Sequence, residues 1–243
     1  MSIRSGATLI QAISRGNGGA GTVSGLARTD VTVTSRQVDL WSRLADVHSR
    51  WNVLDHPFYQ RWTRGEVSAA ELALYAGQYR HAVVALARAA DSTARASARI
   101  ELAAHAGEEA AHVSLWDSFA TAAGADVPAE AEPETAECAD AWAGEGRDLL
   151  GHLVALYAIE SAQPAISRVK ADGLREHYGF ASGPGTAYFD LHAVRDVEHA
   201  ADARALIAER LDGADEDALV AEAERVLRAN WTLLDGVERL CAY

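Results

Sequence analysis

Apolar residues recur at three- and four-residue intervals along most of this chain, and no run shows the period-two alternation of a β-strand. Within residues 36–53 one such stripe contains Val38, Trp41, Leu44, Val47 and Trp51. Alanine, the residue with the highest helix propensity, is very abundant. The pattern therefore predicts an all-α protein.

Capping and turn signals divide the chain into helices. Ser68 followed by Glu71 is a capping box, which opens a helix through about residue 90. Pro164 predicts a kink within a later helix, because proline lacks the N–H that bonds the preceding turn. The predicted helices cover residues 36–53, 56–65, 68–90, 91–123, 137–142, 147–178, 187–211 and 215–241. The intervening residues 125–136 and 181–186 are predicted loops.

The 243 residues suffice for one domain, which we place at residues 36–243. Residues 1–35 are rich in Gly, Ser and Thr and are predicted to form a flexible tail. The apolar pair Leu9 and Ile10 leaves open a second interpretation, in which this segment is a short structured arm that contacts a partner subunit.

The charge balance argues against two classes of partner. The chain has 22 basic and 35 acidic residues, so its net charge is −13, which disfavours binding to nucleic acids or anionic membranes. No run approaches the about 20 apolar residues that span a bilayer, and the N-terminus lacks the pattern of a signal peptide. Two distant cysteines fit a reducing compartment. We therefore expect a cytoplasmic protein.

The strongest chemical motif is His-x3-Asp-x2-His, formed by His192, Asp196 and His199. At about 100° per residue, these side chains share one narrow face of a helix. Two imidazoles and a carboxylate in this arrangement can bind a metal ion. The alternative is a solvated polar face that carries two incidental histidines.

A second motif lies in residues 105–116. Glu109 and His112 form Glu-x-x-His, a spacing used by di-iron carboxylate bundles, and Glu108 with His112 forms the four-residue alternative. His105 precedes His112 by seven residues and shares its face. Exposed Glu–His pairs are common on helices, so this motif has weight only in combination with others.

The third element is Glu160, the single carboxylate in the long apolar run of residues 149–170. A glutamate inside a core helix must be paired, protonated or metal-bound, unless it lies on a polar stripe of that helix. The three segments together offer three imidazoles and three carboxylates. This nitrogen and oxygen set suits two iron ions, or iron with manganese.

Residues 56–79, 115–116, 156–180 and 188–200 resemble the haem-oxygenase-like di-metal oxidases. The similarity covers roughly residues 40–240 and is greatest to the CADD-like branch, near PqqC and TenA in fold. The resemblance implies a compact bundle of about seven helices, without haem, that uses two iron ions or an Fe/Mn pair and O2 as co-substrate. It also implies an external reductant and a homodimer.

Carried over by position, the resemblance implies metal ligands at His112, Glu160, His192, Asp196 and His199. This sequence departs from the family pattern at the first glutamate ligand, because the insert before His112 is shorter here than in the CADD-like branch. Glu109 or Glu108 would supply that ligand, with Glu109 preferred for its Glu-x-x-His spacing. His105 occupies the ungapped position and ranks behind both.

The CADD-like branch is associated with para-aminobenzoate, a folate precursor made from a tyrosine and a lysine of the protein itself. By position, Tyr59 corresponds to the sacrificial tyrosine, Lys170 to the amino donor, and Tyr75 to a further tyrosine near the centre. Lys170 is the only lysine in the chain. The alternatives are an ordinary core aromatic for Tyr59 and a surface residue for Lys170.

Three competing functions remain open from the sequence. A di-iron oxygenase of this fold could act on an external small molecule, by amine N-oxygenation, desaturation or carbon–carbon cleavage, in a biosynthetic pathway. The second competing function is that of a metal-free enzyme like PqqC or TenA. The third is a non-catalytic helical interaction protein whose acidic surface binds a basic partner.

Overall fold

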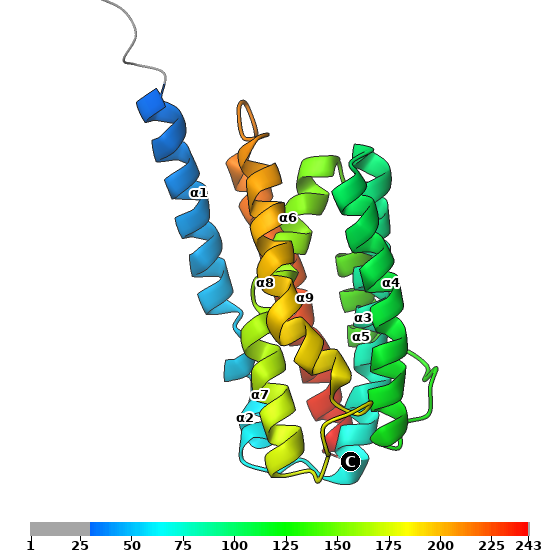
Figure 1. Cartoon of the computed structure of the whole chain (residues 1–243). Helices are drawn as coiled ribbons and strands as arrows, with labels where there is room; N and C mark the ends of the chain where they lie inside the picture. The colour runs from blue at the N-terminus through cyan, green and yellow to red at the C-terminus, as the bar shows by residue number, and fades with distance from the viewer. Residues whose placement is uncertain (1–29, 243) are drawn as a thin grey trace, which may run out of the picture.

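The computed structural model describes residues 30–242, and side chains from residue 40 onward. All regular structure in this span is helical (Figure 1), which confirms the predicted all-α class. The elements are α1 (Asp30–Arg50), the 3-10 helix η1 (Val53–Asp55), α2 (Pro57–Thr63), α3 (Ala69–Ser97), α4 (Ile100–Ala122), α5 (Pro133–Ala143), α6 (Leu149–Glu160), α7 (Gln163–Glu176), α8 (Ala187–Ala208) and α9 (Glu216–Cys241).

The N-terminal prediction lies largely outside the described residues. Residues 1–29 of the expected tail, with Leu9 and Ile10, are in that part of the chain. Residues 30–35 belong to α1, so this helix begins before the predicted position 36.

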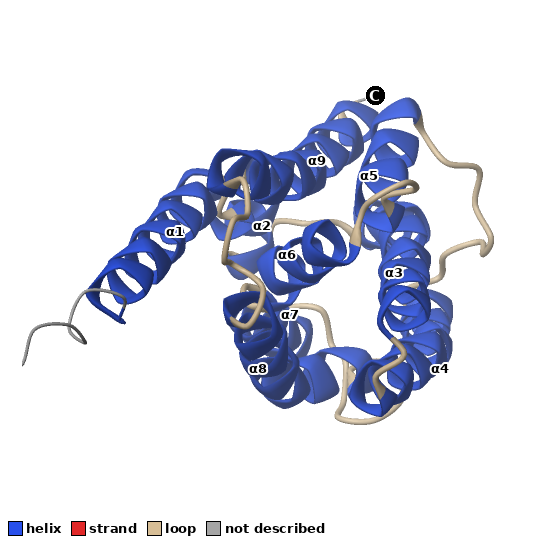
Figure 2. Cartoon of the chain, turned by 90° about the horizontal axis from the view of Figure 1, so that it is seen from above, coloured by secondary structure: helices blue, strands red, loops and turns tan. Residues whose placement is uncertain are grey.

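Helix α6 lies in the middle of the bundle. Seen from above, the other long helices surround it, and α1 extends from the outside of the bundle (Figure 2). The sequence of α6 is apolar on every side, and a helix of that kind is stable only when it is buried all round. Its carboxyl end, Glu160, is therefore placed inside the core.

Local capping sets most helix boundaries. The capping box at Ser68 forms as predicted, with the Ser68 side chain accepting from Glu71 N and the Glu71 carboxylate accepting from Ser68 N. The bounds of α3 and α5 differ from the prediction. Helix α3 continues past Asp91 to Ser97, and α5 begins at Pro133 inside the predicted loop, because proline fits the first turn of a helix.

The predicted helix at residues 147–178 is two helices. Helix α6 ends at Glu160 and α7 begins at Gln163, with Pro164 in its first turn. The missing N–H of Pro164 makes a helix start the favourable arrangement at this point. The break matters for the site, because α6 packs on α3, α8 and α9, while α7 packs on α2 and α8.

Between residues 30 and 242, no helix has the length and apolar character needed to cross a membrane.

Candidate metal centre

Helices α4, α6 and α8 bring seven potential ligands into one buried cluster. The residues, all buried, are His105, Glu109 and His112 from α4, Glu160 from α6, and His192, Asp196 and His199 from α8. The seven-residue spacings in α4 and α8 place each trio on one helix face, as the sequence predicts. Because α8 contacts both α4 and α6, the three faces converge.

The ligand atoms form two adjacent groups that share Glu109. His105, Glu109, Glu160 and His199 each offer an atom within 4.8 Å of the others, and so do Glu109, His112 and His192. Asp196 adjoins the first group, with one carboxylate oxygen 3.7 Å from Nδ1 of His199. A carboxylate common to two groups is the arrangement that a pair of neighbouring metal ions needs.

Several of these atoms have no hydrogen-bond partner within the described residues. Among them are both carboxylate oxygens of Asp196, Nε2 of His192 and Nδ1 of His199. Buried polar atoms are nearly always hydrogen-bonded, since an unpaired one costs about 1–3 kcal/mol. All four atoms are metal-ligand types and face the same cluster, so the residues fit a bound metal pair.

The charges of the cluster support the same conclusion. Burial raises the pKa of Glu160. Burial acts in the same direction on Glu109, but His112 and His192 outweigh it and hold the pKa of Glu109 well below its usual range. Burial lowers the pKa of His105, yet Glu160, 2.8 Å away, overcomes this effect and raises it to about 9. Three buried carboxylates need cations, and divalent metal ions supply them.

Contacts outside the cluster fix the orientation of two imidazoles. Nδ1 of His192 donates to the Tyr188 carbonyl at 2.7 Å, and the Tyr188 ring stacks on the His192 ring at 4.0 Å. Nε2 of His199 lies 3.2 Å from a Glu108 oxygen. The other ring nitrogen of each histidine is thereby directed into the cluster, as in known metal sites.

Glu108 and Glu109 are separated by the helix geometry. Glu108 faces Arg195, with its two oxygens 2.7 and 2.8 Å from the guanidinium, and the hydrogen bonds from Arg195 lower its pKa to about 2. It belongs to neither ligand group, whereas Glu109 belongs to both. His105, ranked last from the sequence, also lies in the cluster.

The second part of the site is an aromatic cage around Lys170. The side chain is 1% exposed, and its Nζ lies 4.4 Å from the ring centre of Tyr79, 5.1 Å from that of Tyr59 and 5.6 Å from that of Tyr75. Burial lowers the pKa of Lys170 to about 7, so a large fraction of the amine is neutral near neutral pH. Lys170 is thus not a surface residue.

Tyr59 and Tyr75 are also fully buried in this cage. Their hydroxyl oxygens are 2.8 Å apart and hydrogen-bonded. Burial, reinforced by the neighbouring tyrosines, raises the pKa of Tyr59 well above its usual value, so the phenol stays protonated. The structure therefore brings the three predicted catalytic residues together.

Two aromatic residues connect the cage with the ligand cluster. Tyr188, stacked on His192, contacts Trp116 with ring centres 4.9 Å apart, and Trp116 lies 6.0 Å from Nζ of Lys170. Tyr188 is not among the site residues predicted from the sequence. Its position four residues before His192 places both on one helix face, a signal that was available.

The sequence matches the family described as iron-containing redox enzymes over residues 72–231, well over half of the chain. It is 31% identical over 220 residues to 4-aminobenzoate synthase of Nitrosomonas europaea, covering 79% of this chain and 88% of that protein. It is 32% identical over 201 residues to 4-aminobenzoate synthase of Chlamydia trachomatis serovar D, covering 76% and 86%.

Solved structures share the fold. A TenA homologue from Pseudomonas syringae aligns with a TM-score of 0.70 at 17% identity, covering 83% of this chain and 92% of that one. A TenA homologue from P. horikoshii gives a TM-score of 0.64 at 16% identity, covering 85% and 98%. The haem-oxygenase-like fold expected from the sequence is confirmed.

Proposed function

The chain belongs to the family of iron-containing redox enzymes, and from this premise we propose that it is an O2-activating oxidoreductase with two metal ions, either two Fe or Fe with Mn. The two ligand groups that share Glu109 support a pair of ions rather than one. His105, Glu160 and His199 would hold one ion, His112 and His192 the other, and Asp196 would complete the set.

When bound, the metal pair supplies the redox chemistry by which O2 is reduced. The protein's own contribution is to hold the ligands in place. Tyr188 and Glu108 orient His192 and His199, and Arg195 fixes Glu108 in turn. An external reductant would restore the divalent metals, and a homodimer stays an expectation.

We further propose that the product is 4-aminobenzoate, the compound named in the relatives, with Tyr59 as the source of the ring and Lys170 as the source of nitrogen. One observation carries this proposal. The only lysine of the chain is buried, and its nitrogen lies 5.1 Å from the ring centre of Tyr59.

The cage residues have separate tasks in such a reaction. The lowered pKa of Lys170 supplies a neutral amine, which is the nucleophilic form. Tyr75 can donate a hydrogen bond to the Tyr59 oxygen or accept one from it, so it can hold a proton there. The surrounding rings exclude water, which protects a reactive intermediate from hydrolysis.

The test is to purify the chain anaerobically, load it with Fe(II), count the metal ions, admit O2 and search for 4-aminobenzoate by mass spectrometry. Two ions per chain and a product that is absent from Tyr59→Phe and Lys170→Arg support the proposal. Peptide mapping should also show covalent changes at positions 59 and 170. Failure to bind metal after loading would refute it.

A second candidate is an oxidase that acts on an external small molecule. A cavity of about 190 Å³ reaches the ligand cluster, and His105, His199, Glu108 and Arg195 are among its lining residues. This opening gives a small molecule a route to the metals. Two bound ions without 4-aminobenzoate and without modification of Tyr59 would favour this candidate.

A further inference from the structure

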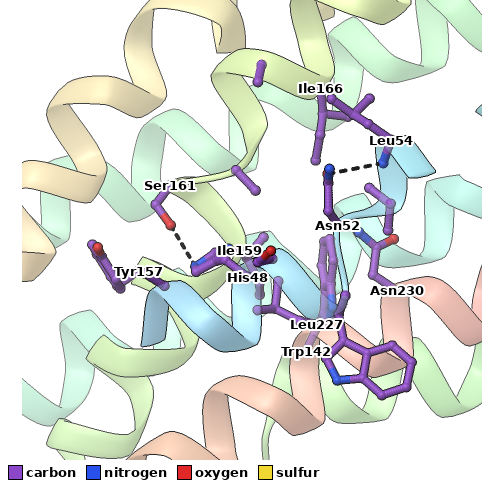
Figure 3. A pocket seen from close by; sticks show the side chains of 16 residues that line it. His48, Asn52, Leu54, Trp142, Tyr157, Ile159, Ser161, Ile166, Leu227 and Asn230 are labelled. Carbon is purple, nitrogen blue, oxygen red and sulfur yellow. Dashed lines mark hydrogen bonds between the residues drawn. The ribbon is translucent and has the colours of Figure 1, made fainter. Parts of the chain in front are cut away.

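A larger cavity, of about 400 Å³, lies between α1, the α6–α7 break and α9. Figure 3 shows the side chains that line it. Ala45, Ser49 and Ala165 are exposed and mark where the cavity meets solvent, whereas Trp142 and Asn230 are buried at its inner end. Its volume is in the range of small-molecule sites.

The walls favour a flat, uncharged group. Trp51, Trp142 and Tyr157 line the cavity together with aliphatic side chains, and none of its lining residues is an acid, an arginine or a lysine. Aromatic walls pack well against a planar ring. A carboxylate on such a ring would meet no lysine or arginine along these walls, so it would point toward the solvent-exposed opening of the cavity.

The polar groups of the cavity leave one acceptor unused. His48 and Ser161 are hydrogen-bonded to each other at 3.0 Å, and Asn52 accepts from Leu54 N at 3.2 Å, as the dashed lines in Figure 3 show. Oδ1 of Asn230, a residue only 4% exposed, has no hydrogen-bond partner within the described chain, and neither has the hydroxyl of Tyr79, which lies close to the Asn230 amide. An unpaired buried acceptor is costly, so Asn230 can accept from a ligand that supplies an N–H or O–H group.

The inner end of the cavity adjoins the aromatic cage. Trp142 contacts Tyr79 with ring centres 6.3 Å apart. Burial raises the pKa of the Tyr79 phenol well above its usual value, and the Asn230 amide lies close enough to oppose part of that effect. Tyr79 in turn lies 4.4 Å from Nζ of Lys170. One aromatic side chain thus connects the cavity with Lys170.

We propose that this cavity is a binding site for a small aromatic amine, held with its ring between the apolar walls and its N–H group donating to Asn230 Oδ1. The ligand could come from solution or from the reaction of the chain itself. The second source rests on the proposed function, under which 4-aminobenzoate forms beside Tyr79 and must leave a closed core.

The binding test needs no turnover and no metal. Equilibrium dialysis of the full chain with 4-aminobenzoate should show one site, and benzoate, which lacks the donor, should bind at least tenfold more weakly. Asn230→Leu should remove the difference between the two compounds. Ala165→Trp, which fills the cavity from its exposed edge, should abolish binding, whereas Ala201→Trp on the exposed face of α8 should not. Equal binding to Ala165→Trp and wild type would overturn the proposal.

The source is tested on the Fe(II)-loaded chain after O2 is admitted. If the amine arises internally, Ala165→Trp should retain 4-aminobenzoate until the protein is denatured, while wild type and Ala201→Trp release it into the filtrate. Equal release from all three would contradict a role of this cavity in holding or releasing an internally formed product. If wild type forms no 4-aminobenzoate, the proposed function fails, and the dialysis experiment still decides whether the cavity binds an aromatic amine.

Discussion

Glu108 and Glu109 are neighbours in the sequence, yet they point about 100° apart around α4 and serve different purposes. Glu109 is buried among the ligands, while Glu108 joins Arg195 to His199 at the edge of the cluster. Burial also distinguishes Lys170, because the single lysine of this chain lies inside the core rather than on the surface. At the scale of residues, burial decides the chemistry.

Replacing Glu108 should weaken metal binding without removing a ligand. In Glu108→Ala the His199 ring loses the contact that directs Nδ1 into the cluster, so we expect affinity to fall about 10–100-fold. Metal retained after dialysis against a competing chelator measures this. Glu198→Ala is the control, because Glu198 also contacts Arg195 but not His199. Equal retention by both variants would exclude an orienting role for Glu108.

Lys170 should make stability depend on pH. Burial lowers its pKa from the ordinary value of 10.5 to about 7. Between these values the unfolded chain binds a proton that the folded chain has lost, so this residue makes the folded state more stable as pH rises, by about 1.4 kcal/mol per unit at most. Relative to wild type, Lys170→Met should therefore gain stability as pH falls from 10 to 7 and gain no more below 7. Urea unfolding at each pH measures this, and parallel curves for the two proteins would contradict it.

At the scale of elements, the break between α6 and α7 organises the site. Because of the break, Glu160 is the last residue of the central helix α6, which packs on α8, while Lys170 belongs to the separate helix α7, which packs on α2 and α8. In one continuous helix, these two residues would lie ten positions apart along a single axis. The break at Pro164 thus allows different helices to enclose the ligand cluster and the aromatic cage.

Glu160 should cost stability unless metal is bound. With a chelator present, replacing the buried pair in the double variant His105→Leu/Glu160→Leu should raise the free energy of unfolding by about 1–3 kcal/mol, because apolar groups replace an ion pair that is costly to bury, whereas Glu160→Leu alone would leave His105 without its partner. Fe(II) should then no longer raise the melting temperature. Thr93→Val, which changes a buried polar group outside the cluster, should retain the response to Fe(II). Destabilisation of the double variant in chelator would contradict this account.

At the scale of the whole molecule, the cluster connects helices that are distant in sequence. The candidate ligands come from residues 105–112, 160 and 192–199, and the three helices also form much of the core. A ligand that binds the folded chain alone stabilises all of it. Metal binding and folding should therefore be coupled through the entire bundle.

Fe(II) should shift the single unfolding transition upward. At a concentration 100 times its Kd, one ion adds about 2.7 kcal/mol, which corresponds to roughly 5–10 °C for a chain of this size. Anaerobic thermal unfolding with Fe(II) and with chelator measures the shift. His177→Ala, a change outside the cluster, should leave it intact. A melting temperature that is the same with and without iron would refute the coupling.

The helical class, the face of each helix that carries candidate ligands and the family could all be predicted from the sequence alone. These follow from spacing along one helix, as with His192, Asp196 and His199, because helix geometry is local and regular. The sequence also marked Lys170 as unusual, since no other lysine is present.

Only the tertiary structure decided which residues meet. Glu109 rather than Glu108 faces the ligands, His105 joins them, and Tyr188 connects them with Lys170, because each outcome depends on how α4, α6, α7 and α8 pack. The cavity at Asn230 likewise arises where α1, the α6–α7 break and α9 meet. Spacing along one helix carries no information about contacts between helices, so burial and pairing appear only once the bundle is assembled.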